Sequence, residues 1–153
     1  MINLNAITIM KKLFTILAGL LLCSFTASAD DRPITSAELP SAARQFIEAH
    51  YPGINILYAT ADKGLFDSDY SVGLDNGTKI EFSGNGLWTE VSNRTQALPA
   101  AIIPAAVADF VAKSYPKAQI LKIERDNRST EVRLDNGLEL KFSTDGRLLE
   151  IDD

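Results

Sequence analysis

Cysteine is almost absent from this sequence, and its scarcity excludes several classes of site. The single cysteine, Cys23, lies inside an apolar run near the N-terminus. We expect that run to be cleaved off, so the remaining chain has no disulfide, no thiolate metal site and no cysteine nucleophile. Leu22 stands where a lipoprotein signal needs a small residue, so lipidation of Cys23 is the less favoured interpretation.

The motifs of common catalytic sites are missing as well. The chain has one histidine, His50, and lacks His-Glu-x-x-His, Gly-x-Ser-x-Gly and a phosphate-binding glycine loop. His50 falls on the apolar stripe of a predicted helix, where a packing or capping role is favoured over catalysis. We therefore predict that the protein is not an enzyme and uses no cofactor. A hydrolase is the remote alternative.

The one long apolar run is too short for a comfortable membrane crossing. It covers about 13 residues, 13–25, whereas a spanning helix needs roughly 20. Lys11 and Lys12 precede the run and Ala27-Ser28-Ala29 follows it, which is the pattern of a cleavable secretory signal. We predict a signal peptide over residues 1–29 and a periplasmic or secreted protein. An uncleaved anchor is the alternative, and the start codon is Met1 or Met10.

Acidic residues exceed basic ones in the exported part. The whole chain has a formal net charge of −5, and loss of residues 1–29 removes Lys11 and Lys12 but no acid, which leaves −7. This balance argues against nucleic acid and anionic lipid as partners. We expect the partner to be another envelope protein, with no membrane span left after signal cleavage.

Two stretches of the sequence occur twice. Residues 40–52 match residues 104–116 at an offset of 64, with proline, alanine, phenylalanine, tyrosine and proline at the same places. Residues 70–91 match residues 130–151 at an offset of 60, with 9 of 22 positions identical. The change of offset means that the first copy carries four extra residues, near residues 62–69. Such self-similarity predicts a repeated structural unit.

Each copy indicates one helix followed by antiparallel strands. Pro40 and Pro104 fit a helix start, and an apolar stripe of helical period follows each of them. The later segments alternate apolar and polar residues, as half-buried strands do. Asn76-Gly77 and Asn136-Gly137 stand between such segments and predict hairpins with type I′ turns.

These patterns predict an α+β fold of two tandem α-β4 units, each a helix packed on a four-stranded antiparallel sheet. The first unit covers residues 30–92 and the second covers residues 93–153. The helix covers the apolar face of each sheet and leaves the other face exposed. Whether the two sheets join is open at this point.

The exposed sheet face is the predicted binding surface. Its candidate residues are Lys79, Glu81, Arg133, Glu139 and Lys141. The enlarged first-copy hairpin adds the candidates Phe66, Asp67 and Asp69, with Phe66 as an aromatic anchor. A charged platform of this kind would recognise a complementary protein surface. The alternative is an ordinary soluble sheet face with cross-strand ion pairs.

The same hairpin contains acidic residues that could be metal ligands. Asp62, Asp67 and Asp69 resemble the opening of a calcium loop, but the glycine and the distal glutamate of such a loop are missing. A solvated hairpin is the favoured interpretation, and no metal site is predicted.

The repeated pattern resembles a known family. The helix Pro-x-x-(Ala/Val)-x-x-Phe-(Ile/Val)-x-x-x-Tyr-Pro, followed by Leu-Asp-Asn-Gly and Phe-Ser-x-x-Gly, is similar to the PepSY-like proteins, also termed β-lactamase-inhibitor-like. The resemblance extends from about Leu39 to Ile151. It implies an exported bacterial protein, and the inhibitor of similar fold uses a concave sheet face and hairpin loops against its enzyme. The sequence thus predicts a non-enzymatic binding or inhibitor-like module. An envelope sensor of a small ligand or calcium is the alternative.

Overall fold

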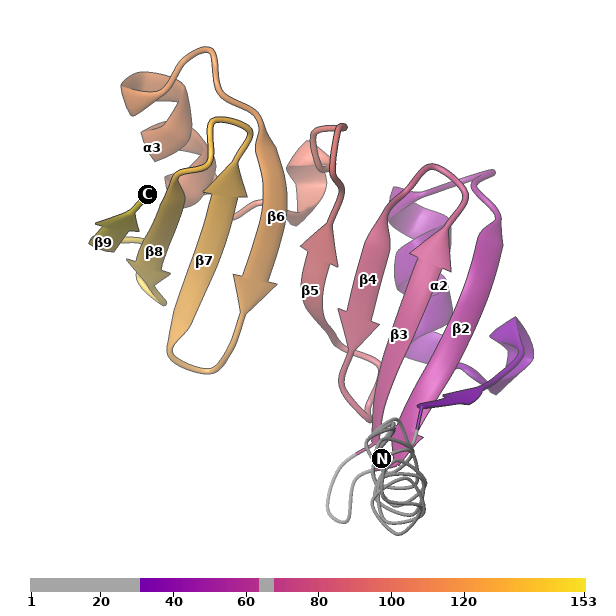
Figure 1. The fold of residues 1–153 in the computed structure, drawn as a ribbon. Coiled ribbons are helices and arrows are strands. Elements are labelled where there is room, and N and C mark those ends of the chain that lie inside the picture. The colour runs from indigo at the N-terminus through magenta and orange to yellow at the C-terminus, as the bar shows by residue number, and fades with distance from the viewer. Residues whose placement is uncertain (1–30, 64–67) are drawn as a thin grey trace, which may run out of the picture.

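The strands of this protein form one continuous antiparallel sheet. The computed structural model describes residues 31–63 and 68–153, and the nine strands within them lie in chain order from β1 to β9 (Figure 1). The strands are β1 (Asp31–Pro33), β2 (Ile56–Lys63), β3 (Ser68–Leu74), β4 (Lys79–Phe82), β5 (Trp88–Ser92), β6 (Ile120–Arg125), β7 (Ser129–Leu134), β8 (Glu139–Ser143) and β9 (Leu148–Asp152).

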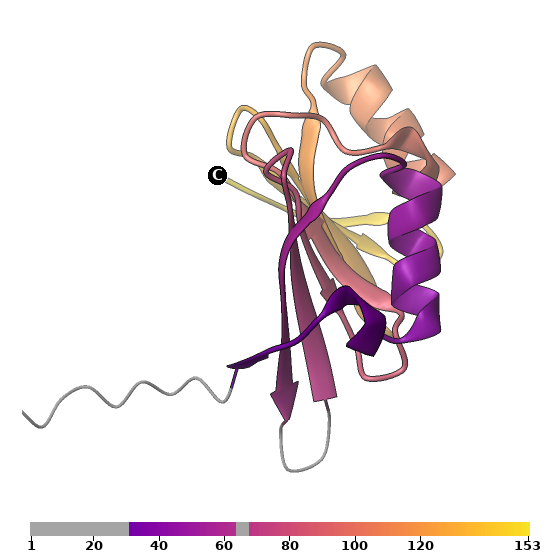
Figure 2. The ribbon, with the colours of Figure 1, turned by 90° about the vertical axis from the view of Figure 1, so that its right-hand side faces the viewer.

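Two α-helices cover one face of this sheet. They are α2 (Ser41–His50) and α3 (Ala105–Ser114), and both lie on the same side of the strands (Figure 2). Each helix begins directly after a proline, Pro40 or Pro104, as the sequence predicts. Two single 3₁₀ turns, η2 (Ser36–Glu38) and η3 (Ala100–Ile102), precede the helices.

The predicted fold class is wrong. The chain does not form two tandem helix-on-four-strand units of an α+β protein, because it has a single nine-stranded sheet with only two short α-helices among the described residues, a mostly β structure. Strand β5 pairs with β6 through Glu90↔Glu124, Val91↔Ile123 and Ser92↔Lys122. Strand β1, which the repeat pattern does not contain, adds the ninth strand beside β2. The division into residues 30–92 and 93–153 stays a prediction.

The physical reason for one sheet is the cost of unpaired strand edges. Two separate four-stranded sheets would expose four edges, each with a row of unsatisfied backbone N–H and C=O groups. Pairing β5 with β6 removes two of those edges. It also buries Val91 and Ile123 completely, at 0% exposure each.

The hairpins lie where the sequence predicts them, but their turn type differs. Gly77 and Gly137 have φ of 83° and 94°, whereas no non-glycine residue of the described chain has a positive φ. The type I′ turn needs positive φ at the asparagine too. The Oδ1 atom of Asn76 instead accepts a hydrogen bond from the Thr78 amide at 3.1 Å, and Asn136 does the same for Leu138 at 3.2 Å. Glycine alone supplies the left-handed residue of a three-residue loop.

The core lies between the helices and the sheet. The α2 residues Ala43 and Ile47 are buried, and the Phe46 ring packs edge-on to Phe82 with centroids 5.8 Å apart. On α3, Phe110 packs in the same way on Phe142, at 5.5 Å. Fully buried side chains from neighbouring strands complete one cluster; they are Val72, Leu74, Ile80, Val91, Ile123, Val132, Leu134 and Leu140.

A buried asparagine fixes the segment that leads from β5 to α3. Asn93 is 5% exposed, and its Nδ2 donates to the Asn76 carbonyl and to the Thr78 hydroxyl, both at 3.1 Å. Its Oδ1 accepts from the amides of Thr95 and Gln96, both at 2.9 Å. This side chain therefore joins the connecting segment to the β3–β4 turn.

The two outer strands of the sheet differ in length and charge. Strand β1 has three residues, one of them Pro33, and pairs with only part of β2. Strand β9 has five residues, of which the last four are exposed. On β9, Glu150 lies opposite Lys141 and Asp152 lies opposite Glu139.

No helix within residues 31–63 and 68–153 is long and apolar enough to cross a membrane. The predicted signal peptide, residues 1–29, lies outside the described residues. Its presence stays a prediction.

The residue that directly follows helix α2, Tyr51, has a buried hydroxyl group. Tyr51 is buried, and in the described part of the chain its hydroxyl makes no hydrogen bond of acceptable geometry. Burial raises the pKa of Tyr51 to about 12, and the nearby Thr78 hydroxyl offsets only part of this effect.

Tyr51 makes the free energy of unfolding depend on pH in the alkaline range. Its folded-state pKa lies above the ordinary 10.0, so the unfolded chain releases this proton first and stability falls as pH rises from 10 to about 12. Relative to Tyr51→Phe, the wild-type protein should lose roughly 2 kcal/mol over this interval. Urea unfolding at several alkaline pH values measures the difference. Tyr115→Phe, at a half-buried site, is the control, and equal pH slopes for wild type and Tyr51→Phe would contradict the assignment.

Candidate functional site

The candidate site is the sheet face that the helices leave uncovered, here called the open face. Figure 1 views this face, with α2 and α3 behind the strands. Along β4, Ile80 and Phe82 are buried on the helix side, while Lys79 and Glu81 project from the other side. The same alternation holds along β7, where Val132 and Leu134 are buried. Every second residue of the central strands therefore belongs to the open face.

Strand register arranges four glutamates in one line across the open face. Glu81 on β4 lies opposite Glu90 on β5, Glu90 opposite Glu124 on β6, and Glu124 opposite Glu131 on β7. Adjacent strands lie about 4.8 Å apart, so these residues, here called the acidic row, span about 15 Å. Like charges directly opposite each other lower stability. The sheet holds this arrangement in spite of that cost.

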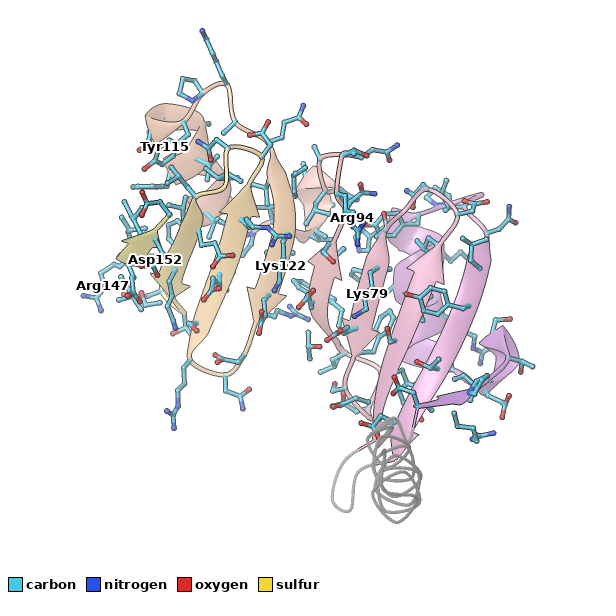
Figure 3. The ribbon with its side chains drawn as sticks, in the orientation of Figure 1. Lys79, Arg94, Tyr115, Lys122, Arg147 and Asp152 are labelled. Carbon is cyan, nitrogen blue, oxygen red and sulfur yellow. The ribbon has the colours of Figure 1, made fainter. Side chains whose placement is uncertain are left out.

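A second line of residues runs beside the acidic row. Lys79 lies opposite Ser92, Ser92 opposite Lys122, and Lys122 opposite Arg133. Lys79, Lys122 and Arg133 are here called the basic row. In Figure 3, Lys79 and Lys122 lie on the strands of the open face, on β4 and β6. On β8 the order reverses, since Arg133 lies opposite Glu139 and Glu131 lies opposite Lys141.

Lys122 is the central cation of the two rows. Its ammonium lies 3.1 Å from the carboxylate of Glu90 and 3.1 Å from that of Glu124. Burial lowers the pKa of Lys122, but the Glu124 and Glu90 carboxylates together raise it above its usual value. The Lys122 side chain is 25% exposed, so this ion pair is shielded from solvent better than most surface pairs.

The other ion pairs of the open face are more exposed. Lys79 pairs with Glu81 at 2.7 Å, and this hydrogen bond is the main reason that the pKa of Lys79 is raised. Lys141 lies 4.0 Å from Glu131. All four side chains are at least 39% exposed, so a partner can reach them.

The structure brings five of the predicted site residues onto this one surface. Lys79 and Glu81 project from β4, and their companions from the second half of the chain are Arg133, Glu139 and Lys141. Asp69 lies on β3, opposite Asp62 of β2. Phe66 and Asp67 lie outside the described residues, so their role stays a prediction.

Sequence reasoning missed Glu90, Lys122 and Glu124, the centre of the face. The alternation of Lys122 and Glu124 with the apolar Ile123 was the available signal. It could not indicate their position, because their neighbours across β5–β6 are about 30 residues distant in the chain. Without that pairing, the acidic row is not visible in the sequence.

An exposed tyrosine was also missed. Tyr58 on β2 lies opposite Gly73 on β3 and is 48% exposed. A Cβ atom at Gly73 would come within 2.0 Å of the Tyr58 ring, so any other residue at this position would displace the ring from the strand. Tyr58 therefore adds an aromatic surface beside Lys79 on the open face.

A shallow hollow lies at the β1 end of the open face. Its volume is about 310 Å³, and its lining includes Asp31, Asp62, Asp69 and Glu81 together with Lys79. Asp31, Asp62 and Asp69 lie directly opposite one another on three adjacent strands. Among residues 31–63 and 68–153, however, no three acidic, histidine or cysteine side chains are grouped closely enough to hold a metal ion.

The two lysines should differ in their contribution to stability. Lys122→Met leaves Glu90 facing Glu124 without a cation, so we expect a loss of about 1 kcal/mol that shrinks in about 0.5 M salt. Lys79→Met removes a more exposed pair and should cost less than about 0.5 kcal/mol. Urea unfolding of both variants at low and high salt tests this. Equal losses, or a loss for Lys122→Met that salt does not reduce, would refute the special position of Lys122.

Comparison with solved structures finds close relatives of this fold. A periplasmic protein from Bacteroides vulgatus, described as "putative", is 41% identical with a TM-score of 0.79, covering 82% of this chain and 99% of its own. A Bacteroides thetaiotaomicron protein, described as a "putative calcium-regulated periplasmic protein", is 40% identical with a TM-score of 0.78, covering 81% and 98%. A further Bacteroides vulgatus protein "of unknown function" is 32% identical with a TM-score of 0.77, covering 80% and 99%.

Comparison with protein families gives a consistent result. No curated protein matches the chain. A family model does match residues 68–150, and it is described as "Putative beta-lactamase-inhibitor-like, PepSY-like". That match covers more than half of the chain and includes β3 to β8 and most of β9. It shows that the chain belongs to the PepSY-like, beta-lactamase-inhibitor-like family.

Proposed function

We propose that this protein is a non-enzymatic binding protein of the cell envelope and that its open face docks on another envelope protein. The observation that carries the proposal is the pairing of β5 with β6, which aligns the acidic row and the basic row on one uncovered sheet face. Both rows cross the strands, so they form a two-line charge pattern that a partner can match.

The charge pattern gives such a contact specificity. A partner with a line of basic groups against Glu81, Glu90, Glu124 and Glu131, and acidic groups against Lys79 and Arg133, satisfies both rows together. A partner of one sign, such as nucleic acid, meets a repelling row whichever way it lies. Complementary charges of this kind mainly raise the association rate and fix the orientation of the complex. Tyr58 supplies an aromatic contact beside them.

The family and the relatives support this proposal. The family is described as beta-lactamase-inhibitor-like, which fits a protein that acts by binding. Two relatives at 40% identity or more are described as periplasmic. We therefore propose that the chain reaches the periplasm by the signal peptide predicted at residues 1–29.

Site-specific photo-crosslinking tests the docking surface. Benzoylphenylalanine in place of Ser71 or Ser92, both on the open face, should give crosslinked adducts in the periplasm of the native host. The same group at Glu48 or Lys113, exposed on the helix side, is the matched control and should give none. Adducts from the helix positions alone would reject the open face as the docking surface.

Charge reversal tests the role of the acidic row. The double variant Glu90→Lys with Glu124→Lys should lower the crosslinking yield at Ser71 by about tenfold, because it replaces the centre of the row with repelling charges. Glu48→Lys, on α2, leaves the row intact and should leave the yield unchanged. An unchanged yield in the double variant would show that the acidic row does not contribute to docking.

A calcium sensor is the second candidate function. The observation in its favour is the alignment of Asp31, Asp62 and Asp69 across three strands, and one relative is described as calcium-regulated. Carboxylate oxygens are the ligands that Ca²⁺ prefers. In the present arrangement these side chains are not grouped as a metal site, so binding would require them to move closer together.

Thermal melting decides on the calcium candidate. An ion that binds only the folded state raises the melting temperature. We expect about 5 mM Ca²⁺ to raise it for the wild type, and Asp62→Asn to abolish that rise. Asp152→Asn, at the far edge of the sheet, is the control for general charge effects. No rise in the wild type, or the same rise with both variants, would remove this candidate.

A further inference from the structure

A second and larger hollow opens where β5 and β6 separate. The two strands pair over only three residues, and beyond Glu90 and Glu124 they diverge. The hollow there is about 770 Å³ and is lined by residues of the β4–β5 turn and of the β6–β7 turn. Both turns lie at the lower ends of their strands in Figure 1. Its lining includes Leu87, Trp88, Thr89 and Arg125.

Arg125 and Trp88 both line this hollow and contact each other. The Arg125 guanidinium carbon lies 3.7 Å from the centre of the Trp88 ring, and the Nε atom donates a hydrogen bond to the Trp88 carbonyl at 3.1 Å. That bond joins the strands where the backbone ladder has ended. The Trp88 ring also packs against Phe46, with centroids 5.9 Å apart. Tryptophan and guanidinium are thus held in fixed positions.

The Arg125 guanidinium is a cation with no anionic partner among residues 31–63 and 68–153. In the described part of the chain, no carboxylate lies within ion-pair distance of it, although six other ion pairs are present. Burial lowers the pKa of Arg125, and no neighbouring acid opposes that shift. With Nε bonded to Trp88, the two terminal nitrogens remain as donors. A guanidinium in this state is ready to bind a carboxylate through two parallel hydrogen bonds.

The polar groups at the rim of the hollow bond within their own turns. The Oδ1 atom of Asn85 accepts from the Ser83 hydroxyl at 2.6 Å and from the Leu87 amide at 3.2 Å. The Oδ1 atom of Asp126 accepts from the amides of Arg128 and Ser129, both at 2.7 Å. Leu87 presents an apolar side chain that is 55% exposed. The lining thus combines the apolar side chains of Leu87 and Trp88 with two charged groups. They are the Arg125 guanidinium, which has no ion-pair partner among the described residues, and the Asp126 carboxylate, whose Oδ1 atom is bonded within its own turn.

We propose that this hollow binds a carboxylate that carries a short apolar body. The carboxylate pairs with the Arg125 guanidinium, and the apolar body lies against Leu87 and the exposed edge of Trp88. Small-molecule sites combine apolar surface with a few polar groups that fix the orientation of the ligand. Here Leu87 and Trp88 supply the apolar surface, in a lining that is otherwise mostly polar. Two sources offer this chemistry, namely a free short-chain carboxylic acid and the C-terminal carboxylate of a peptide. The site is separate from the rows of the open face and does not depend on the proposed docking function.

Trp88 reports on its own site, because it is the only tryptophan of the chain. Titration with hexanoate should change the tryptophan emission in a saturable way. Acetate should bind at least about tenfold more weakly, since it lacks the apolar body, and hexanol should give no saturable change. N-acetyl-leucine tests the peptide source against its amide, N-acetyl-leucinamide. Tighter binding of N-acetyl-leucine than of hexanoate assigns the site to peptide C-termini, and the reverse assigns it to free acids.

Variants separate binding from a purely structural role of Arg125. Arg125→Gln should weaken hexanoate binding at least about tenfold, whereas Arg133→Gln, on the open face, should leave it unchanged. Leu87→Ser should weaken hexanoate but not acetate. Arg125→Lys keeps a cation and a long stem if the glutamine variant is unstable, and it should retain weak binding. The rise in melting temperature with hexanoate provides a readout that does not depend on Trp88 emission.

Three results would overturn the proposal. They are the absence of any saturable change with hexanoate or N-acetyl-leucine up to about 50 mM, hexanol binding as tightly as hexanoate, and undiminished hexanoate binding by folded Arg125→Gln. In each case Arg125 would serve only to hold β5 beside β6.

Discussion

The backbone pairing of β5 with β6 is the contact on which the rest of the structure depends. Only three residue pairs make this contact, yet they turn two groups of strands into one sheet and bury Val91 against Ile123. They place Glu90 beside Glu124 and so complete the acidic row. Where the same pairing ends, the strands diverge and leave the hollow above Trp88 and Arg125. One short ladder therefore creates both candidate surfaces.

The local elements could be predicted from sequence, and their assembly could not. Proline before α2 and α3, and alternation along β4 and β8, are signals carried by neighbouring residues, so both helices and the hairpins were located. The joining of β5 to β6 involves residues about 30 positions apart and has no local signature. The predicted turn type is wrong because the Asn76 side chain accepts a hydrogen bond from the Thr78 amide. The Asn-Gly pair is compatible with this alternative turn. At the candidate site, the alternation of apolar and polar residues predicts five members of the open face, namely Lys79, Glu81, Arg133, Glu139 and Lys141. The positions of Lys122, Glu90 and Glu124 follow only from the strand register.

The open face holds a charge arrangement that stability alone would not favour. Four glutamates on adjacent strands repel one another, and Lys122 relieves this only for Glu90 and Glu124. Glu81 and Glu131 rely on the more exposed Lys79 and Lys141. The helix side has no such pattern, since its residues form the apolar core. One face of the sheet thus forms the core, and the other is the face for which we propose docking on another protein.

The two outer strands have a consequence for how copies of this chain meet. An exposed strand edge invites another edge to extend the sheet. At one end, β1 is short and contains Pro33, which has no amide hydrogen to offer a further strand. At the other end, β9 carries Glu150 and Asp152, so two such edges repel each other. The proline at one border and the acidic residues at the other disfavour the edge-to-edge pairing that would extend this sheet from one copy of the chain to the next.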